Sequence, residues 1–363
     1  MTARRFLIAG LLASFLGCGP FLGYATASAA VIGVVAPRTG PYALLGTQVF
    51  QGARIAAEAA GDTVVEIDES CDEAGGTAVA KGLIDAKASV AIGFLCVETL
   101  STALPQLKAA QIPALSISVR SKILMEDALR NGWPFFRMAP VEGMEADKLS
   151  ETILAIWKAE PIAIVEDGTI YGRELASAIR QHLEPMGMSP TFTDTFRPGQ
   201  EQQVALVRRL AKAGATHVFV GGDRNDVSII ARDAASENIR LSLIAGDTMR
   251  AANRPVPLRE GVMAVALPDY LALPSAAAAI AALRARNIDP DGYMLPAYAS
   301  VELAHQAIIA SAGKPATAAI ANGNFNTAIG PIAFDKGHEL KNNPFRLLEW
   351  RGSALVLSHP ATE

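Results

Sequence analysis

Small residues, hydroxyls and isolated charges gather where the predicted strands of this sequence end. Six segments have this character: Thr39–Leu45, Cys96–Thr99, Ser116–Arg120, Glu166–Tyr171, Gly221–Arg224 and Gly246–Thr248. Backbone N–H groups and hydroxyls donate to a carboxylate, and a carboxylate accepts hydrogen bonds from an ammonium group. In open parallel α/β sheets, ligands bind outside the carboxyl ends of the strands. These segments therefore predict a site for a small polar molecule.

The sequence offers few combinations of residues that would support catalysis. The sequence contains no G-x-S-x-G elbow, Walker A loop or G-x-G-x-x-G motif. No two histidines have the spacing of metal ligands among His182, His217, His305, His338 and His359. His217 starts a predicted strand, at the end opposite the expected site, which indicates a structural role. We therefore expect a binding protein, not an enzyme, with no catalytic residue, metal or cofactor.

The strand-end segments belong to two successive series in which short β-rich runs alternate with helical patterns. The apolar run Val31–Val35 is typical of a buried parallel strand. Further strands are expected at 64–67, 90–95, 114–118, 162–165, 191–196, 217–220 and 241–245. Helices are expected after Pro41, at 76–87, 100–110, 171–183 and 203–213, and through Ile229. Such alternation predicts parallel sheets with helices on both faces, in an α/β fold.

The region from Val262 to Glu363 is shorter and less regular. It contains a strand at 262–267, Ala-rich helical patterns at 275–286 and 296–312, and a hairpin that pairs 345–350 with 354–357. Because it is too small for a third α/β domain, we expect it to complete the first two and the chain to cross between them repeatedly. The predicted lobes are 30–139 plus 269–332, and 140–268 plus 333–363.

Chain length and net charge limit the number of domains and the classes of partner. The chain has 363 residues, which fits roughly two compact domains. A formal net charge of -4 and the lack of any Lys/Arg run provide no basic surface for nucleic acid. An aromatic content of 6% also argues against stacking platforms for single strands.

Residues 1–29 have the pattern of a signal peptide. Arg4 and Arg5 precede the apolar run Phe6–Leu16, and Ala27-Ser28-Ala29 is a small-x-small cleavage site. Two alternatives remain open: an uncleaved membrane helix, and a lipoprotein modified at Cys18. Each of the three predicts export.

The predicted export affects the expected redox state of the cysteines. Cys71 and Cys96 are the two that follow the predicted leader, and an oxidising compartment favours a disulfide between them. The alternative is a pair of buried free thiols.

An ordered set of motifs resembles the branched-chain amino-acid binding proteins of ABC transporters, a family related to the Leu/Ile/Val-binding protein. The set comprises Val34–Pro41 followed by Gly46, Phe50 and Gly52–Arg54, then Asp68–Asp72, Gly93–Cys96, Tyr171-Gly172, Gly221-Gly222 and Ile329–Gly337. The resemblance covers essentially the whole chain after the leader. It implies the type I periplasmic binding fold, with two Rossmann-like lobes, three crossovers and a ligand in the cleft. It also implies a Cys71–Cys96 disulfide in the first lobe.

The resemblance also implies roles for particular residues. Leu45 would cover the side-chain pocket, Tyr171 would cover the ligand, and Asp247 would receive an amino group. The full set of expected ligand-binding residues is Leu45, Val97, Ser116, Ser118, Arg120, Tyr171, Asp223 and Asp247.

Two positions depart from the family pattern. Val97 stands where relatives commonly place a serine, and Arg120 stands near a threonine position, with Glu98 close by. The guanidinium of Arg120 suits a carboxylate bidentately, although a salt bridge to Glu98 or a solvated position would explain it equally. A turn or N-cap role is the alternative for Asp247, and helix-start packing is the alternative for Tyr171.

These observations predict a periplasmic solute-binding protein that delivers an amino acid or related small carboxylate to an ABC importer permease as a monomer. The alternatives are an amide, a urea-like compound or an aromatic acid as ligand, or a module that serves a separate sensor.

Overall fold

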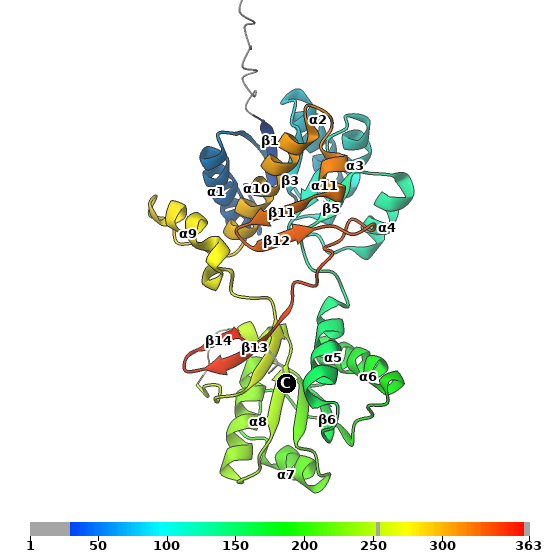
Figure 1. Cartoon of the computed structure of the whole chain (residues 1–363), viewed down its shortest axis with the longest axis vertical. Coiled ribbons are helices and arrows are strands. Elements are labelled where there is room, and N and C mark those ends of the chain that lie inside the picture. The colour runs from blue at the N-terminus through cyan, green and yellow to red at the C-terminus, as the bar shows by residue number, and fades with distance from the viewer. Residues whose placement is uncertain (1–29, 252–254, 359–363) are drawn as a thin grey trace, which may run out of the picture.

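The computed structural model describes residues 30–251 and 255–358 and consists of two α/β lobes stacked along the long axis (Figure 1). The predicted leader at 1–29, including Cys18, and His359 lie outside the described residues. Within the described part of the chain, none of the helices is long and apolar enough to cross a membrane.

The first lobe is built on a five-stranded parallel sheet of order β2-β1-β3-β4-β5. Its strands are β1 (Val31–Ala36), β2 (Thr63–Asp68), β3 (Val90–Gly93), β4 (Ala114–Ser116) and β5 (Phe135–Arg137). The helices α1 (Ala43–Ala60) and α10 (Met294–Ser311) pack together on one face of this sheet. The other face carries α2 (Glu73–Asp85), α3 (Val97–Ala109) and α4 (Lys122–Asn131). The lobe is completed by α9 (Ala277–Arg284), α11 (Thr317–Asn322) and the hairpin of β11 (Asn324–Thr327) and β12 (Gly330–Ala333).

The second lobe contains a seven-stranded mixed sheet of order β14-β13-β10-β9-β8-β6-β7. Its strands are β6 (Ile162–Glu166), β7 (Phe192–Thr195), β8 (His217–Gly221), β9 (Ser242–Ala245), β10 (Met263–Ala266), β13 (Arg346–Arg351) and β14 (Ala354–Leu357). One face packs on α5 (Met144–Trp157) and α6 (Ile170–Leu183), and the other on α7 (Val204–Lys212) and α8 (Arg224–Ser236). The antiparallel strands β13 and β14 form the predicted terminal hairpin. The part of the chain that the structure describes also contains four 3₁₀ turns: η1 (Glu184–Met186), η2 (Asp247–Arg250), η3 (Tyr270–Ala272) and η4 (Pro274–Ala276).

Local sequence explains how these elements form. In β1 the apolar residues Ile32, Val34 and Val35 are wholly buried, as expected for a strand covered on both faces. Asp72 caps α2 because its carboxylate accepts a hydrogen bond from the backbone N–H of Gly75. Gly52 brings α1 against α10, because a Cβ atom there would lie 2.1 Å from the backbone oxygen of Met294.

The chain passes between the lobes three times, after β5, after β10 and before β13. The predicted boundaries at 139 and 268 fall within the first two crossovers. The predicted boundary at 332 is wrong, because Phe334 is buried in the core of the first lobe and its ring centroid lies 5.2 Å from that of Phe136. Glu339 also pairs with Arg137 of β5. The third crossover therefore follows residue 341.

Candidate ligand-binding site

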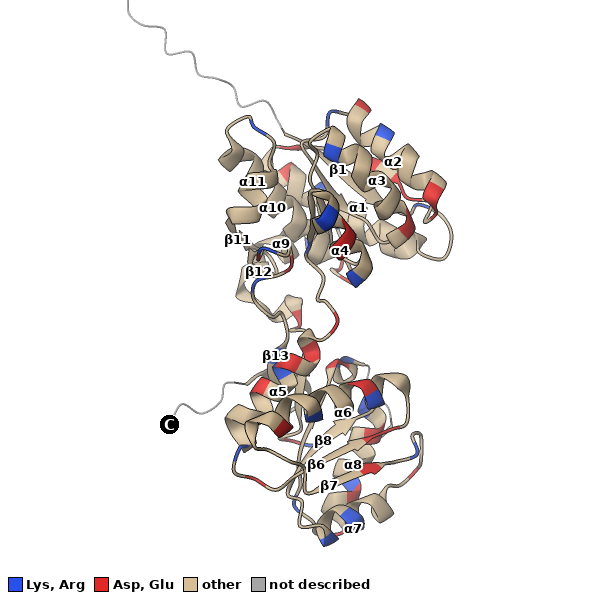
Figure 2. Cartoon of the chain, turned by 90° about the vertical axis from the view of Figure 1, so that its right-hand side faces the viewer, with Lys and Arg blue, Asp and Glu red and all other residues tan. Residues whose placement is uncertain are grey.

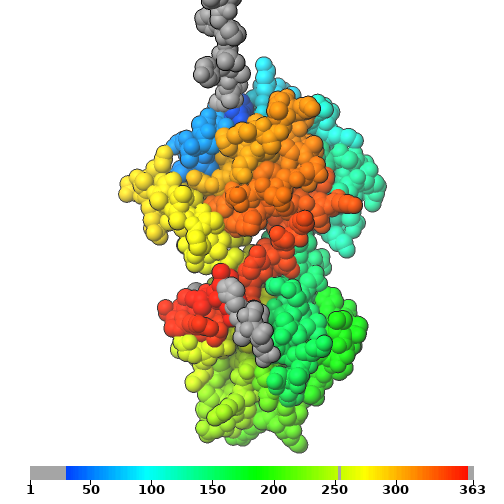
Figure 3. All heavy atoms as spheres, in the orientation of Figure 1, coloured from blue at the N-terminus to red at the C-terminus, as the bar shows by residue number. Residues whose placement is uncertain are grey.

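A cleft of about 590 Å³ opens where the first crossover enters the second lobe. Arg120 lines it from the first lobe, and Glu145, Tyr171 and Leu175 line it from the second. The space-filling view shows a deep waist between the lobes, and Figure 2 shows acidic residues around the start of α5 beside it (Figures 2 and 3). Of the strand-end segments predicted from the sequence, two reach this cleft, through Arg120 and Tyr171.

Three segments of the second lobe converge on one oxygen atom of Glu145. The Tyr171 hydroxyl donates to Glu145 Oε1 at 2.6 Å, and the backbone N–H of Asp247 donates to the same oxygen at 2.7 Å. Gly246 makes room for this cluster, because a Cβ atom there would lie 2.2 Å from that oxygen and 2.3 Å from the Tyr171 hydroxyl. Glu145 was not among the residues predicted from the sequence.

Burial governs the protonation of this cluster. Burial raises the pKa of the Glu145 carboxyl, while the hydrogen bonds from Tyr171 and Asp247 and the charge of Arg120 act in the opposite direction. Burial and the neighbouring Glu145 also raise the pKa of the Tyr171 hydroxyl. Tyr171 therefore remains a neutral donor, and Glu145 Oε1 is its acceptor.

Asp247 holds part of its own surroundings in place. It is the first residue of η2 and is half-buried, and its Oδ1 accepts a hydrogen bond from the backbone N–H of Leu267 at 2.9 Å. Leu267 directly follows β10, so Asp247 ties the second crossover to the strand-end loop. Its side chain thus has a structural partner in addition to the predicted role toward a ligand amino group.

In the first lobe, Arg120 and Ser118 are accessible, whereas Ser116 is not. Arg120 is exposed and lines the cleft, and it forms no ion pair with Glu98 among the described residues. The Ser118 hydroxyl accepts a hydrogen bond from Tyr293 Oη at 3.0 Å, which leaves its own hydrogen available. Ser116 is wholly buried, and its hydroxyl donates to the backbone oxygen of Phe94 at 3.0 Å. The prediction of Ser116 as a ligand contact is therefore corrected: its hydroxyl shapes the loop.

The remaining predicted residues lie at helix starts. Leu45 is in the first turn of α1, and Val97 is the first residue of α3; both are half-buried. Asp223 caps α8, because its carboxylate accepts a hydrogen bond from the backbone N–H of Asp226 at 2.9 Å. The cap uses one oxygen of the exposed Asp223 carboxylate, and its contact with a ligand stays a prediction.

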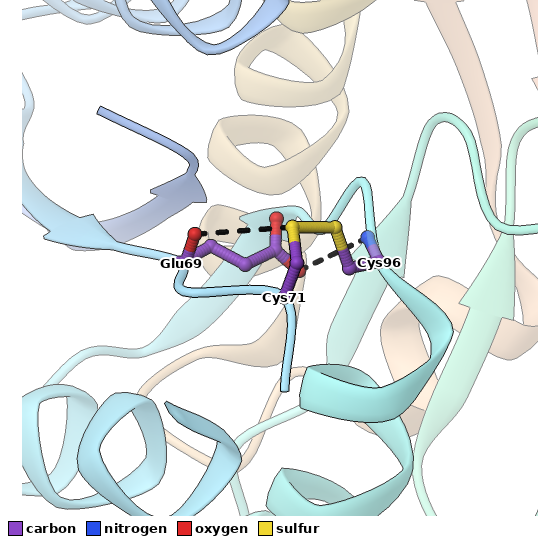
Figure 4. Close-up of side chains that lie close together, drawn as sticks. All are labelled: Glu69, Cys71 and Cys96. Carbon is purple, nitrogen blue, oxygen red and sulfur yellow. Dashed lines mark hydrogen bonds between the residues drawn. A yellow bond between two sulfur atoms is a disulfide. The ribbon is translucent and has the colours of Figure 1, made fainter. Parts of the chain in front are cut away.

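A buried carboxylate and two linked cysteines brace the loop that leads to Val97 (Figure 4). Cys71 and Cys96 form a disulfide, with Cα atoms 5.1 Å apart. Glu69 is 1% exposed, and its two oxygens accept the backbone N–H groups of Leu95 at 2.8 Å and of Cys96 at 3.1 Å. Burial raises the pKa of Glu69 to about 7. Because the two sulfur atoms are bonded to each other, they do not offer the thiolate ligands of a metal site.

Comparison with known proteins places this architecture in a family. The model of the periplasmic binding protein family matches residues 30–354. An "amino acid binding protein" of Pseudomonas aeruginosa is 28% identical over 96% of this chain and 97% of its own length.

Two solved structures share the fold. A Rhodospirillum rubrum protein assigned to branched-chain amino acid ABC transport superposes with a TM-score of 0.76 at 16% identity, covering 91% of this chain and all of that chain. A solute-binding protein of an ABC transporter from Rhodopseudomonas palustris, in complex with p-hydroxybenzoic acid, gives a TM-score of 0.59 at 18% identity, covering 91% and 95%. The family drawn from the sequence motifs and the predicted two-lobed α/β fold are confirmed. The chain belongs to the periplasmic binding protein family.

Proposed function

We propose that this protein is exported, captures an amino acid or a related small carboxylate between its lobes, and delivers it to an ABC importer. The main support for this proposal is that the two sides of one cleft carry opposite charges. Arg120 lies on the first lobe and Glu145 on the second. A guanidinium suits a carboxylate, and a carboxylate suits an ammonium group. A zwitterion satisfies both sides, and the amino acid binding protein of Pseudomonas aeruginosa is a relative of matching length.

An aromatic acid is the second candidate, since a protein of the same fold holds p-hydroxybenzoic acid. Such a ligand would pair with Arg120 but would place no positive charge beside Glu145. The two candidates therefore differ in whether the acidic side of the cleft contributes to affinity.

A thermal-shift screen followed by calorimetry tests the proposal. The probes are L-leucine, L-leucinamide, 4-methylpentanoate and 4-hydroxybenzoate, which separate the need for a carboxylate from the need for an ammonium group. We expect L-leucine to bind more tightly than either truncated analogue. Arg120→Ala should weaken its binding at least tenfold, whereas Arg130→Ala on the exposed side of α4 should not. Binding of 4-hydroxybenzoate alone would favour the aromatic acid, and binding of none would contradict both.

Export is the remaining part of the proposal. Cleavage near Ala29 would release a monomer into the periplasm, where it would meet the importer permease. Mass spectrometry of the periplasmic fraction should find a chain that begins within a few residues of Ala30. A lipid-modified Cys18 at the N-terminus would contradict the freely diffusing form.

A further inference from the structure

Arg137, the last residue of β5, is the largest fully buried side chain of the described residues, and it contacts two separate segments. Its Nε lies 3.1 Å from Glu339 Oε2, and its Nη2 donates to the backbone oxygen of Ser121 at 2.9 Å. Its backbone N–H donates to the oxygen of His338 at 3.0 Å. Arg137 therefore fastens the start of the first crossover both to the segment before the third crossover and to the residue after Arg120.

A second fastening lies at the other end of the same two crossovers. The side-chain amide of Asn343 donates to the backbone oxygen of Met144, and its Oδ1 accepts the N–H of Phe345 at 3.0 Å. Met144 begins α5, and the next residue is Glu145. Asn343 therefore fastens the third crossover to the helix start that carries the half-buried carboxylate of Glu145.

The contacts of Arg137 and those of Asn343 share two features. Each joins the first and third crossovers, one at the first lobe and one at the second, and the chain between them is 138–143 and 340–342. Each also holds a backbone carbonyl one residue away from a charge of the cleft, Ser121 beside Arg120 and Met144 beside Glu145.

We infer that Arg137 and Asn343 are positioning residues that couple the bending of the paired crossovers to the placement of Arg120 and Glu145 in the cleft. This inference rests on the proposed function, because it assigns the two charges to a ligand. Neither positioning residue contacts the ligand itself; each acts through the carbonyl that it holds. Misplacing a charged group by about 1 Å weakens a charge-assisted hydrogen bond, whose strength depends on short, aligned geometry.

Asn343→Asp is the sharpest test at the second lobe. Aspartate keeps the acceptor for the N–H of Phe345 and loses the donor to Met144. The matched control is Asn342→Asp, the same substitution at the exposed neighbouring position. We expect Asn343→Asp to weaken L-leucine binding about tenfold and Asn342→Asp to leave it unchanged, by calorimetry.

Double-mutant cycles separate positioning from general stability. If Asn343 acts through Glu145, the losses of Asn343→Asp and Glu145→Gln should not add, and the double variant should bind about as weakly as Glu145→Gln alone. At the first lobe, Glu339→Gln combined with Arg120→Ala should behave likewise, with the exposed Glu126→Gln on α4 as its control. Arg137→Lys keeps the positive charge but loses the forked guanidinium donors, so we expect this variant to bind L-leucine more weakly than wild type. Additive losses in both cycles would overturn the inference.

Hydrogen exchange of the ligand-free protein provides a test that needs no ligand. Asn343→Asp should speed amide exchange in the first turn of α5 at least tenfold relative to Asn342→Asp. Equal exchange in the two variants would overturn the inference. If wild type does not bind L-leucine, the amino-acid form of the proposed function fails, and this exchange comparison still decides whether the crossovers are fastened as inferred.

Discussion

The carboxylate of Glu145 accepts hydrogen bonds from the Tyr171 hydroxyl and from the backbone N–H of Asp247, so three segments of the second lobe meet at one oxygen atom. Two of these segments follow strands and were predicted from the sequence, but the third follows a crossover. A search restricted to strand ends could not reach Glu145, because its place in the cleft depends on where the first crossover delivers α5.

Removing the charge of Glu145 should weaken the binding of a ligand that has an ammonium group. Glu145→Gln keeps the shape of the side chain, and we expect L-leucine to bind at least tenfold more weakly, or about 1.4 kcal/mol. Glu151→Gln on the exposed side of α5 is the control. Calorimetry at neutral pH measures both, and wild-type affinity in Glu145→Gln would show that no ammonium group lies beside it.

Ser116 and Ser118 show that residue type alone does not predict which hydroxyl is accessible to a ligand. Ser116 is the last residue of β4 and Ser118 lies two residues beyond it, and both were expected to bind the ligand. The Ser116 hydroxyl is consumed by the backbone oxygen of Phe94, whereas that of Ser118 retains a free donor. Only the path of the loop distinguishes them, and hydrogen-bonding type in the sequence does not encode that path.

Glu69 should make the stability of the protein depend on pH. Burial raises its pKa from 4.5 to about 7, so the folded state binds more protons than the unfolded chain between these values. The free energy of unfolding therefore falls as the pH rises through this window, by up to about 3 kcal/mol from this group. Glu339, with a pKa of about 7, and Asp226, with a pKa of about 6, act in the same direction.

Glu69→Gln should remove one of these contributions. We expect urea unfolding at pH 5 and pH 8 to show a smaller loss of stability with rising pH in this variant than in wild type. Glu73→Gln, at an exposed position of α2, should keep the wild-type dependence. An unchanged dependence in Glu69→Gln would show that this carboxyl is ionised across the whole range.

At the scale of elements, the β3–α3 connection is held from two directions. Phe94 has a φ of 56°, a left-handed conformation that a bulky residue rarely adopts unless its surroundings hold it there. Glu69 accepts the next two backbone N–H groups, and the disulfide joins Cys96 to the β2–α2 connection. The loop before Val97 is therefore fixed before any ligand binds.

Breaking the disulfide should lower stability more than affinity. A loop of this length is worth about 3 kcal/mol in the chain-entropy model, and Glu69 would still hold the loop in the folded state. We expect the paired substitution Cys71→Ser with Cys96→Ser to lose stability of that order in urea unfolding, while the affinity for L-leucine falls less than tenfold. Nonreducing peptide mapping of the exported protein should recover both cysteines in one linked peptide. Free alkylation of both thiols in the native protein would contradict the pairing.

Most of the buried strands were predicted from the sequence, but α4, β5 and α5, between Lys122 and Trp157, were not. The apolar run from Val31 was expected to be a buried strand and forms β1. By contrast, β5 is only three residues long and was not anticipated, since Phe135–Arg137 is too short to show periodicity. Its last residue, Arg137, is fully buried although its side chain is charged, so a search for hydrophobic patterns does not find the strand.

At the scale of the whole molecule, the division into two lobes follows from the repeated βαβ rhythm, but the exact crossover points do not. Residues 333–341 were assigned to the second lobe together with the terminal hairpin. They remain with the first lobe because Phe334 and His338 pack on Phe136. Tertiary contacts of this kind join residues about 200 positions apart and leave no local signal.

Exposed apolar side chains lie at the starts of helices in both lobes. Leu44, Ile123 and Ile170 are 71%, 72% and 67% exposed, and each lies in the first turn of a helix that follows a strand. Helices of this kind begin at the carboxyl edges of the sheets, where the cleft lies. If the lobes close on a ligand, these side chains lose contact with water, and burying one of them is worth about 1.5–3 kcal/mol.

Closure should therefore depend on Ile170, which precedes Tyr171 at the start of α6. Ile170→Ser should weaken the binding of L-leucine about tenfold, because the apolar contribution to the closed state is lost and the hydrogen-bonding groups of the cleft are retained. The control is Ile309→Ser, at a position of α10 that is 65% exposed and far along the helix from the cleft edge. Small-angle scattering should show a smaller radius of gyration on adding L-leucine to wild type, and a smaller fraction of this change in Ile170→Ser at equal ligand concentration. If the radius of gyration of wild type does not change when L-leucine is bound, the ligand is held without closure, and the exposure of Ile170 must have another cause.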